Sequence, residues 1–265
     1  MKFECALYSD VGIVKKTNQD SMLLKEAETD YGRILLAAVC DGMGGLSKGE
    51  VASAYVVNQL SEWFENALPE LLYGQNTRYT NHELKKHIRK ALEYVAADAN
   101  GKIYEYGRKN HTMLGSTLSV ILLIENHYFI LNVGDSRVYK IYNSLIQLTK
   151  DQSLVQQKVD RGEISEEDME KDPQRNVLLQ CIGATSDVKP DFYSGIYEDD
   201  SVFLLCSDGF RHMLKKEELF YCYRPQVLSD ESFMRNMSIR LVELNKQRQE
   251  KDNISVIVIH AKKDW

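Results

Sequence analysis

The sequence predicts an α+β fold in one domain that spans residues 1–265. Short strand-like runs open the chain and fill its middle, two long amphipathic segments stand between them, and a further helix precedes the last strand-like run. With only four prolines and no internal repeat, the sequence shows no linker that would divide the chain. A chain of 265 residues can bury most of its apolar surface without disulfides or structural metals.

The first third of the chain begins with three short strands. They are expected at Phe3–Tyr8, Ser21–Lys25 and Arg33–Cys40. The third strand is rich in Leu, Ala and Val and stops at Asp41-Gly42, which is a turn signal. The sequence therefore predicts that Asp41 lies at the end of a buried strand.

Two helices follow these strands. Over about Lys48–Ala67, and again from Asn81 to about Tyr106, apolar residues recur every three or four positions, as one face of a helix requires. Thr80 and Glu83 have the spacing of a capping box, which starts the second helix.

The middle and the end of the chain are rich in β-structure. Four runs separated by turn signals predict an antiparallel meander: Ser116–Ile124, Tyr128–Val133, Arg137–Tyr142 and Leu145–Leu148. The polar, charged segment at about 151–180 is expected to form a helical excursion on the surface. Three strands and one helix complete the expected fold: Asp191–Ile196, Val202–Cys206, the helix Phe233–Asn245 and Ile254–His260.

Composition excludes several classes of protein. The formal net charge is −6, which argues against nucleic-acid binding, because that function needs a positive surface. The charged N-terminus does not resemble a signal peptide, and the longest apolar run, near Val120–Ile124, is too short to span a bilayer. The five cysteines show no C-x-x-C spacing. Free thiols fit a reducing compartment, so a cytoplasmic protein is expected.

Four aspartates share one kind of position. Asp41 and Asp208 each end a strand before a glycine, Asp135 lies between two strands, and Asp252 precedes the last strand. Oxygen ligands favour hard cations such as Mg²⁺ or Mn²⁺, and two such ions about 3.5–4 Å apart can activate a water for attack on phosphorus. Asp-Gly is also a common turn dipeptide, so spacing alone leaves a second reading open, in which these are turn residues.

Taken in order, the motifs resemble those of the metal-dependent PPM family, the type 2C serine/threonine protein phosphatases, in its compact bacterial form. The motifs cover nearly the whole chain. They are Lys15-Lys16-Thr17-Asn18-Gln19-Asp20, Val39-Cys40-Asp41-Gly42-Met43-Gly44-Gly45, Gly49-Glu50-Val51-Ala52-Ser53, Gly115-Ser116-Thr117, Gly134-Asp135-Ser136-Arg137, Gln174-Arg175-Asn176-Val177-Leu178, Ile182-Gly183, Leu205-Cys206-Ser207-Asp208-Gly209 and Asp252-Asn253-Ile254-Ser255.

The resemblance implies a fold and a metal site. The fold would be an α-β-β-α sandwich of two antiparallel sheets flanked by helices, with the metal centre at one end of the sheets and the segment at about 151–180 as a flap beside it. By motif position, Asp41 would bridge two catalytic ions, Mn²⁺ or Mg²⁺, and the Gly42 carbonyl would bind one of them. Asp208 and Asp252 would bind the other. Asp135 with Asp208 would form a third, weaker metal site.

Three positions depart from the family pattern. Lys15 stands where the family usually has an arginine that grips the substrate phosphate, and lysine is a point charge without that fork, so Lys16 could share the role. Gln19 replaces a common glutamate and can still hydrogen-bond a water, while Asp20 is expected to orient waters around the metals. Met43 stands where animal relatives have a histidine proposed as general acid.

The resemblance implies hydrolysis of phosphoserine and phosphothreonine on proteins by direct attack of a metal-bridging hydroxide. The expected partners are phosphorylated proteins, among them a bacterial serine/threonine kinase and its substrates. The protein is expected to be a monomer that binds no nucleic acid and does not span a membrane. Two alternatives remain. One is a catalytically weak pseudophosphatase that binds phosphoproteins as a regulator. The other is a phosphatase for an anti-sigma-factor antagonist.

Overall fold

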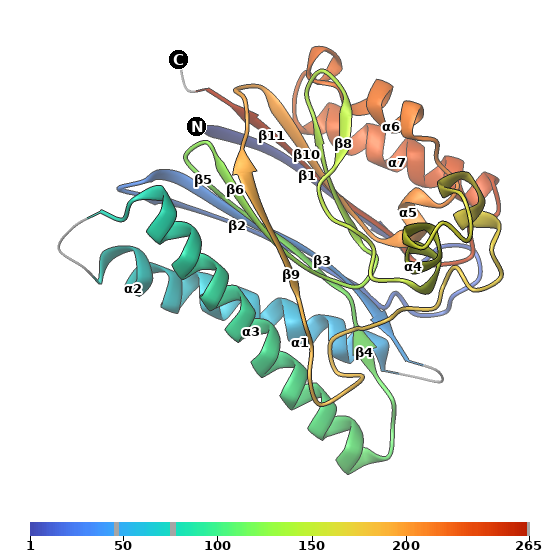
Figure 1. Ribbon diagram of the computed structural model, residues 1–265. Coiled ribbons are helices and arrows are strands. Elements are labelled where there is room, and N and C mark those ends of the chain that lie inside the picture. The colour runs from blue at the N-terminus through green and yellow to red at the C-terminus, as the bar shows by residue number, and fades with distance from the viewer. Residues whose placement is uncertain (45–47, 75–77, 264–265) are drawn as a thin grey trace.

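Two antiparallel β-sheets lie face to face in the computed structural model, and helices cover the outer face of each sheet (Figure 1). The structure describes residues 1–44, 48–74 and 78–263. The predicted sandwich of two sheets flanked by helices is therefore confirmed. Gly45, which closes the Asp41-to-Gly45 motif, lies outside the described residues.

One sheet contains both ends of the described chain. Its five strands run in the order β1-β11-β10-β7-β8. Their bounds are β1 Lys2–Asp10, β7 Arg137–Ile141, β8 Leu145–Gln147, β10 Ser201–Cys206 and β11 Ile254–Lys262. Three α-helices and a short 3₁₀ turn lie between β10 and β11 in the sequence and pack on the outer face of this sheet: α5 Asp208–Arg211, α6 Lys216–Tyr223, η3 Pro225–Val227 and α7 Glu231–Gln247.

The other sheet has the order β2-β3-β5-β6-β9, with β4 paired to the end of β3. Its strands are β2 Asp20–Thr29, β3 Gly32–Met43, β4 Gly115–Ser116, β5 Leu118–Ile124, β6 His127–Val133 and β9 Asp191–Ile196. Helices on its outer face are α1 Gly49–Glu62, the π-turn η1 Trp63–Ala67, α2 Leu68–Tyr73 and α3 Asn81–Asn110. The predicted capping box of Thr80 and Glu83 starts α3.

Strand β3 shows why the central strands read as continuous apolar runs. Alternate side chains of a strand point to opposite faces. Leu35 and Val39 face the core between the two sheets, whereas Leu36 and Ala38 face the core under α1 and α3. Because both faces are covered, neither face needs polar residues. The buried stretch from Ile34 to Cys40 has no charged side chain, and Asp41 follows directly after it.

The predicted meander is wrong at one turn. β5 pairs with β6 and β7 pairs with β8, but β6 and β7 belong to different sheets. Gly134, with a φ of +99°, carries the chain from one sheet to the other. The reason is long-range pairing: β7 lies beside β10, with Arg137 opposite Cys206. Local turn residues do not reveal that choice.

The segment at 151–180, predicted to be a helical excursion, contains two short helices joined by irregular structure. It contains α4 (Leu154–Asp160) and the 3₁₀ turn η2 (Glu166–Lys171), which lie near α5 in Figure 1. Helix α6 was not expected from the sequence. Among the helices that the structure describes, none has both the length and the apolar character needed to cross a membrane.

Candidate metal centre

The end of strand β3 fixes Asp41 through its backbone. Its N–H donates to the Thr117 hydroxyl at 2.9 Å, and its carbonyl accepts from the Thr117 N–H, also at 2.9 Å. The next N–H, of Gly42, donates to the Gln19 carbonyl at 3.1 Å. Asp41 also lies opposite Asp20 in the β2–β3 register. Two segments far apart in the sequence therefore hold Asp41 and Asp20 side by side.

Gly42 and Gly49 allow two backbones to approach each other closely. A Cβ on Gly42 would lie 2.5 Å from the Gln19 carbonyl oxygen and closer still to that of Gly49. A Cβ on Gly49 would lie 2.7 Å from the Gly42 carbonyl oxygen. Glycine is required at both positions, because any side chain would separate β3 from the start of α1. The sequence analysis gave Gly49 no role, although its glycine was the available signal.

The other sheet supplies Asp208 and Asp252. Asp208 follows β10 and opens α5, and Asp252 directly precedes β11, the neighbour of β10. Ser207 N–H donates to the Ser255 carbonyl at 3.1 Å, which ties the two segments together. The ends of both sheets thus bring carboxylates to one place.

The electrostatics of Asp41 show that the four predicted aspartates and Asp20 are neighbours. Burial raises the pKa of Asp41 well above its usual range, and the negative charges of Asp20, Asp208, Asp252 and Asp135 act in the same direction. Carboxylates that crowd together in a buried place resist ionisation unless a cation joins them. The structure therefore brings together the residues that were predicted to meet.

Asp20 is buried at the centre of this group. Burial raises its pKa to about 7, with the charges of Asp208 and Asp252 adding to the effect and the hydroxyls of Ser255 and Ser207 opposing it. Within the described residues, neither oxygen of Asp20 has a partner in hydrogen-bond geometry, and the same holds for Oδ1 of Asp208. Buried oxygens in this state call for a cation or for ordered water.

Lys15 lies at the edge of the group. Its Nζ is 2.8 Å from Oδ1 of Asp252, and its side chain is 39% exposed. Burial lowers the pKa of Lys15, but the hydrogen bond and charge of Asp252, with the charges of Asp41 and Asp208, outweigh burial and raise it. The ammonium group is therefore charged at neutral pH and accessible from solvent.

Gln19 and Met43 occupy the remaining predicted positions. The Gln19 side chain donates to Oε2 of Glu50 on α1 at 3.3 Å, and its backbone N–H donates to Oδ1 of Asn253 at 2.9 Å. Gln19 therefore links β2, α1 and the segment before β11. Met43 is the last residue of β3 and pairs with Gly115 on β4.

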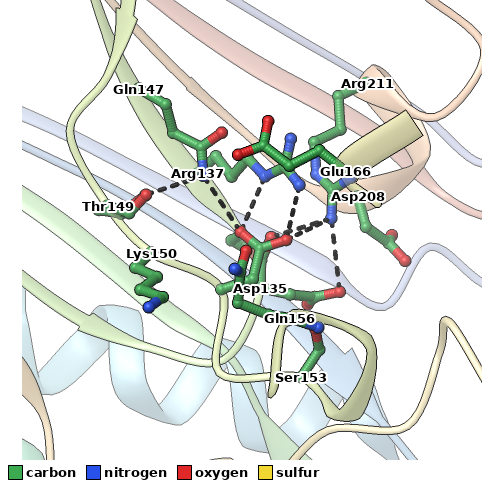
Figure 2. A network of polar contacts seen from close by, with 12 residues as sticks. Asp135, Arg137, Gln147, Thr149, Lys150, Ser153, Gln156, Glu166, Asp208 and Arg211 are labelled. Atoms are coloured by element: carbon green, nitrogen blue, oxygen red, sulfur yellow. Dashed lines mark hydrogen bonds and ion pairs between the residues drawn. The ribbon is translucent and has the colours of Figure 1, made fainter. Parts of the chain in front are cut away.

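Asp135 reaches the group, but an arginine partners it. Nη2 of Arg211 lies 3.6 Å from Oδ2 of Asp135, and both side chains are buried. Burial and the charge of Asp208 raise the pKa of Asp135 to about 7, while Arg211 acts in the opposite direction. Figure 2 shows the Arg211 guanidinium directed toward Asp135, with Arg137 beside it.

Three residues near the centre had no role in the sequence analysis: Arg211, His212 and Asp151. His212 lies between two carboxylates, with Nε2 3.7 Å from Asp208 and Nδ1 3.6 Å from Glu250. Arg211 and His212 come after Asp208-Gly209-Phe210, and their closeness to Asp208 in the sequence was the available signal. Burial opposes the ionisation of Asp208, but His212 and Arg211 outweigh it and lower its pKa.

The donor set fits hard divalent cations. No three Asp, Glu, His or Cys side chains in the described part of the chain converge tightly enough to form a complete metal cage. The chemistry is nevertheless suitable, because the group offers carboxylate and carbonyl oxygens and no sulfur or imidazole ligand is needed. The partnerless oxygens of Asp20 and Asp208 and the raised pKa of Asp41 show that positive charge is what the group lacks.

Comparison with known proteins supports this interpretation of the site. Residues 13–244 match the family described as protein phosphatase 2C. The chain is 30% identical to the protein phosphatase PhpP of Streptococcus pneumoniae over 266 residues, which covers 93% of this chain and 100% of the relative. It is 29% identical to a putative protein phosphatase 2C-type of Streptococcus pyogenes, with 96% of each chain covered.

Solved structures give the same result. Stp1, a serine/threonine phosphatase of Staphylococcus aureus, has a TM-score of 0.83 and 28% identity, with 100% of this chain and 96% of that chain covered. The catalytic domain of the phosphatase PstP, solved in complex with two manganese ions, has a TM-score of 0.77 and 26% identity, covering 98% and 99%. From the family match and the aspartates at the ends of the two sheets, we conclude that the chain belongs to the protein phosphatase 2C family of serine/threonine phosphatases.

Proposed function

We propose that this chain hydrolyses phosphoserine and phosphothreonine esters on proteins, with two divalent ions, Mn²⁺ or Mg²⁺, held by its aspartates. The observation that carries the proposal is the group of carboxylates around Asp41 at the end of β3, where burial and four neighbouring carboxylates raise the pKa of Asp41 well above its usual range. Carboxylates crowded in this way favour a ligand of opposite charge, and strongly shifted pKa values cluster at functional sites. The PstP structure, with its two manganese ions, supports a pair of ions as that ligand.

Four residues would hold the ions. Asp41 is central to the group and would contribute to both ions, the Gly42 carbonyl would contribute to one, and Asp208 and Asp252 to the other. When bound, such ions lower the pKa of a water and neutralise the charge on phosphoryl oxygens. Asp20, whose oxygens lack partners in the described structure, would then accept hydrogen bonds from waters around the ions.

Lys15 would bind the substrate phosphate. Its ammonium group has three donors and now uses one of them on Asp252 at 2.8 Å. Partial exposure leaves the others free to reach a phosphate that enters from solvent. Lysine contributes a point charge without the two-pronged geometry of arginine, so its contribution is mainly attraction and less orientation.

The proton for the leaving oxygen would come from water. Met43 has a thioether and cannot donate a proton, although it stands at the end of β3 beside the metal centre. An alkoxide leaving group requires protonation from a nearby donor. Solvent water at this partly exposed edge of the site supplies it in our proposal.

The physiological substrates would be phosphoproteins made by a serine/threonine kinase, which this enzyme would oppose. The relatives named serine/threonine phosphatase stp, from Listeria, support this substrate class. The five cysteines of this chain are all free, as a reducing cytoplasm permits, and we propose that location.

Hydrolysis of a phosphothreonine peptide tests the proposal. We expect activity with Mn²⁺ or Mg²⁺ and loss of activity with EDTA. Asp208→Asn should lower kcat/KM by at least about 100-fold, since even partners that merely orient metal ligands cost 10–100-fold. The exposed Asp187 offers a matched control, and Asp187→Asn should retain wild-type activity.

Activity that survives EDTA or Asp208→Asn would contradict the proposed mechanism. Phosphopeptide binding without turnover under any metal would favour the alternative, a regulator that binds phosphoproteins.

A further inference from the structure

Arg211 is a buried cation beside the metal centre. Nη2 of its guanidinium lies 3.6 Å from Oδ2 of Asp135, 3.4 Å from the Asp135 carbonyl oxygen and 3.3 Å from Oδ2 of Asp151. The side chain of Arg211 is only 6% exposed. Figure 2 shows Arg211 and Asp135 at the centre of a connected polar network, with Arg137 beside them.

The surrounding structure fixes Arg211 in this place. Asp151 accepts two parallel hydrogen bonds from Arg137, at 2.8 and 2.7 Å, which is the geometry of a strong ion pair. The residue after Asp151, Gln152, exchanges hydrogen bonds with Gly134 through its backbone N–H and its side-chain carbonyl, both at 2.9 Å. The segment that carries Asp151 is therefore anchored beside Asp135, and Arg211 joins the two carboxylates.

The charges of this network already balance. Arg137 and Arg211 supply two positive charges, and Asp135 and Asp151 supply two carboxylates. Burial opposes the ionisation of Asp151, but Arg211 and Arg137 outweigh it and lower its pKa. Buried carboxylates that are already paired with guanidinium groups have less need of a further cation.

A third divalent ion would be badly placed here. To bind both Asp135 and Asp208, it would have to lie next to the guanidinium that already contacts Asp135, and it would be repelled. Asp208 is already assigned to a catalytic ion in the proposed function, and His212 lies 3.7 Å from its Oδ2 on the side of α5. The third site that the resemblance implies therefore does not fit the residues of this chain.

We propose that Arg211 takes the place of a third metal ion, so that Asp135 binds no metal and the chain holds two ions. This inference rests on the proposed function, because it concerns the same metal centre. It also gives Arg211 a positioning role: it links Asp135, next to the metal centre, to Asp151 at the base of the flap.

Counting bound Mn²⁺ tests the inference without any measurement of activity. The electron paramagnetic resonance signal of free Mn²⁺ falls as the ion binds, so a titration gives the number and the affinity of bound ions. We expect two ions on the wild-type protein and two on Asp135→Asn, with the affinity changed by less than about threefold. Asp208→Asn should weaken binding of at least one ion by more than tenfold.

Variants of Arg211 test the role of its charge. Arg211→Gln removes the cation and should allow a third, weaker Mn²⁺ to bind, whereas Arg211→Lys keeps the charge and should bind two. A thermal melt shows which variants fold, and the wild-type and Asp135→Asn titrations decide the question even when the Arg211 variants do not fold.

Three ions on the wild-type protein, or loss of one ion in Asp135→Asn, would overturn the inference and leave the proposed function standing. No gain of an ion in a folded Arg211→Gln would overturn the role of Arg211. No bound ion at all on the wild-type protein would overturn both the inference and the proposed function.

Discussion

Gly42 offers the sharpest test of how the backbone builds the metal centre. In Gly42→Ala, the new methyl group would lie 2.5 Å from the Gln19 carbonyl oxygen and closer to that of Gly49. Ordinary contact between a carbon and an oxygen is more than 3 Å, and both obstacles are backbone atoms that cannot rotate away. Strand β3 must therefore separate from β2 and from the start of α1, and the displacement includes the Asp41 carboxylate and the Gly42 carbonyl.

The cost of this change follows from known overpacking effects. Inserting a methyl group into a well-packed place costs about 1–3 kcal/mol, and a domain of this size loses roughly 2–4 °C of melting temperature per kcal/mol. We therefore expect the melting temperature to fall by about 2–12 °C. Gly101 provides the matched control, because a Cβ there meets nothing within 4 Å and the residue lies inside helix α3. Gly101→Ala should raise stability by about 0.5–1 kcal/mol.

Thermal melts of the wild type and both variants, with and without Mn²⁺, measure these effects. The reasoning also requires Gly42→Ala to bind Mn²⁺ more weakly, while Gly101→Ala binds it as the wild type does. A Gly42→Ala protein with wild-type melting temperature and wild-type Mn²⁺ affinity would refute the close approach of Gly42 and Gly49.

Three further perturbations probe other parts of the structure. Lys15→Ala should raise KM for a phosphopeptide more than it lowers kcat, as loss of ground-state phosphate binding requires, and an unchanged KM would exclude phosphate contact by Lys15. Arg137→Ala removes the paired hydrogen bonds to buried Asp151 and should lower the free energy of unfolding in urea by about 3–5 kcal/mol, whereas a loss below 1 kcal/mol would show that Arg211 alone is enough to compensate Asp151. Hydrogen bonds from Arg248 lower the pKa of Glu218 to about 2, below the unfolded value of 4.5, so this pair stabilises the fold above about pH 4.5 and ceases to do so as the pH falls toward 2. The stability difference between Glu218→Gln and the wild type should therefore shrink between pH 5 and pH 2, and a difference that stays constant would contradict the ion pair.

The sequence predicted those parts of the fold that depend on local pattern. Buried strands such as β3, and the capped helix α3, carry a complete signal in their own residues, so their positions were predicted within a few residues. The passage of the chain from one sheet to the other at Gly134 was not predicted, because a short link that contains glycine suits a hairpin as well as a crossing between sheets. That choice depends on β10, which follows about 60 residues later and offers β7 a buried neighbour.

The candidate site shows a similar division. The resemblance placed Asp41, Asp208 and Asp252 together, and the mutual electrostatic effects in the structure bring the same residues into one group. The pairing of Asp135 with Arg211 could not be predicted, because the closeness of Arg211 to Asp208 in the sequence does not show which distant carboxylate its side chain contacts. In the folded chain the Arg211 guanidinium lies beside Asp135 and Asp151, which are far from it in the sequence.

Two buried polar groups with opposite character therefore lie next to each other. In one, Arg137 and Arg211 satisfy Asp135 and Asp151, and the network stabilises the position of the flap base by itself. In the other, burial and the charges of Asp208 and Asp252 raise the pKa values of both Asp20 and Asp41. Because a ligand that binds only the folded state adds stability, about 2.7 kcal/mol at 100 times its Kd, divalent ions that bind the second group should stabilise the whole fold. In our proposal the group around Asp41 binds the metal ions, and Arg137 and Arg211 take the place of a cation beside Asp135 and Asp151.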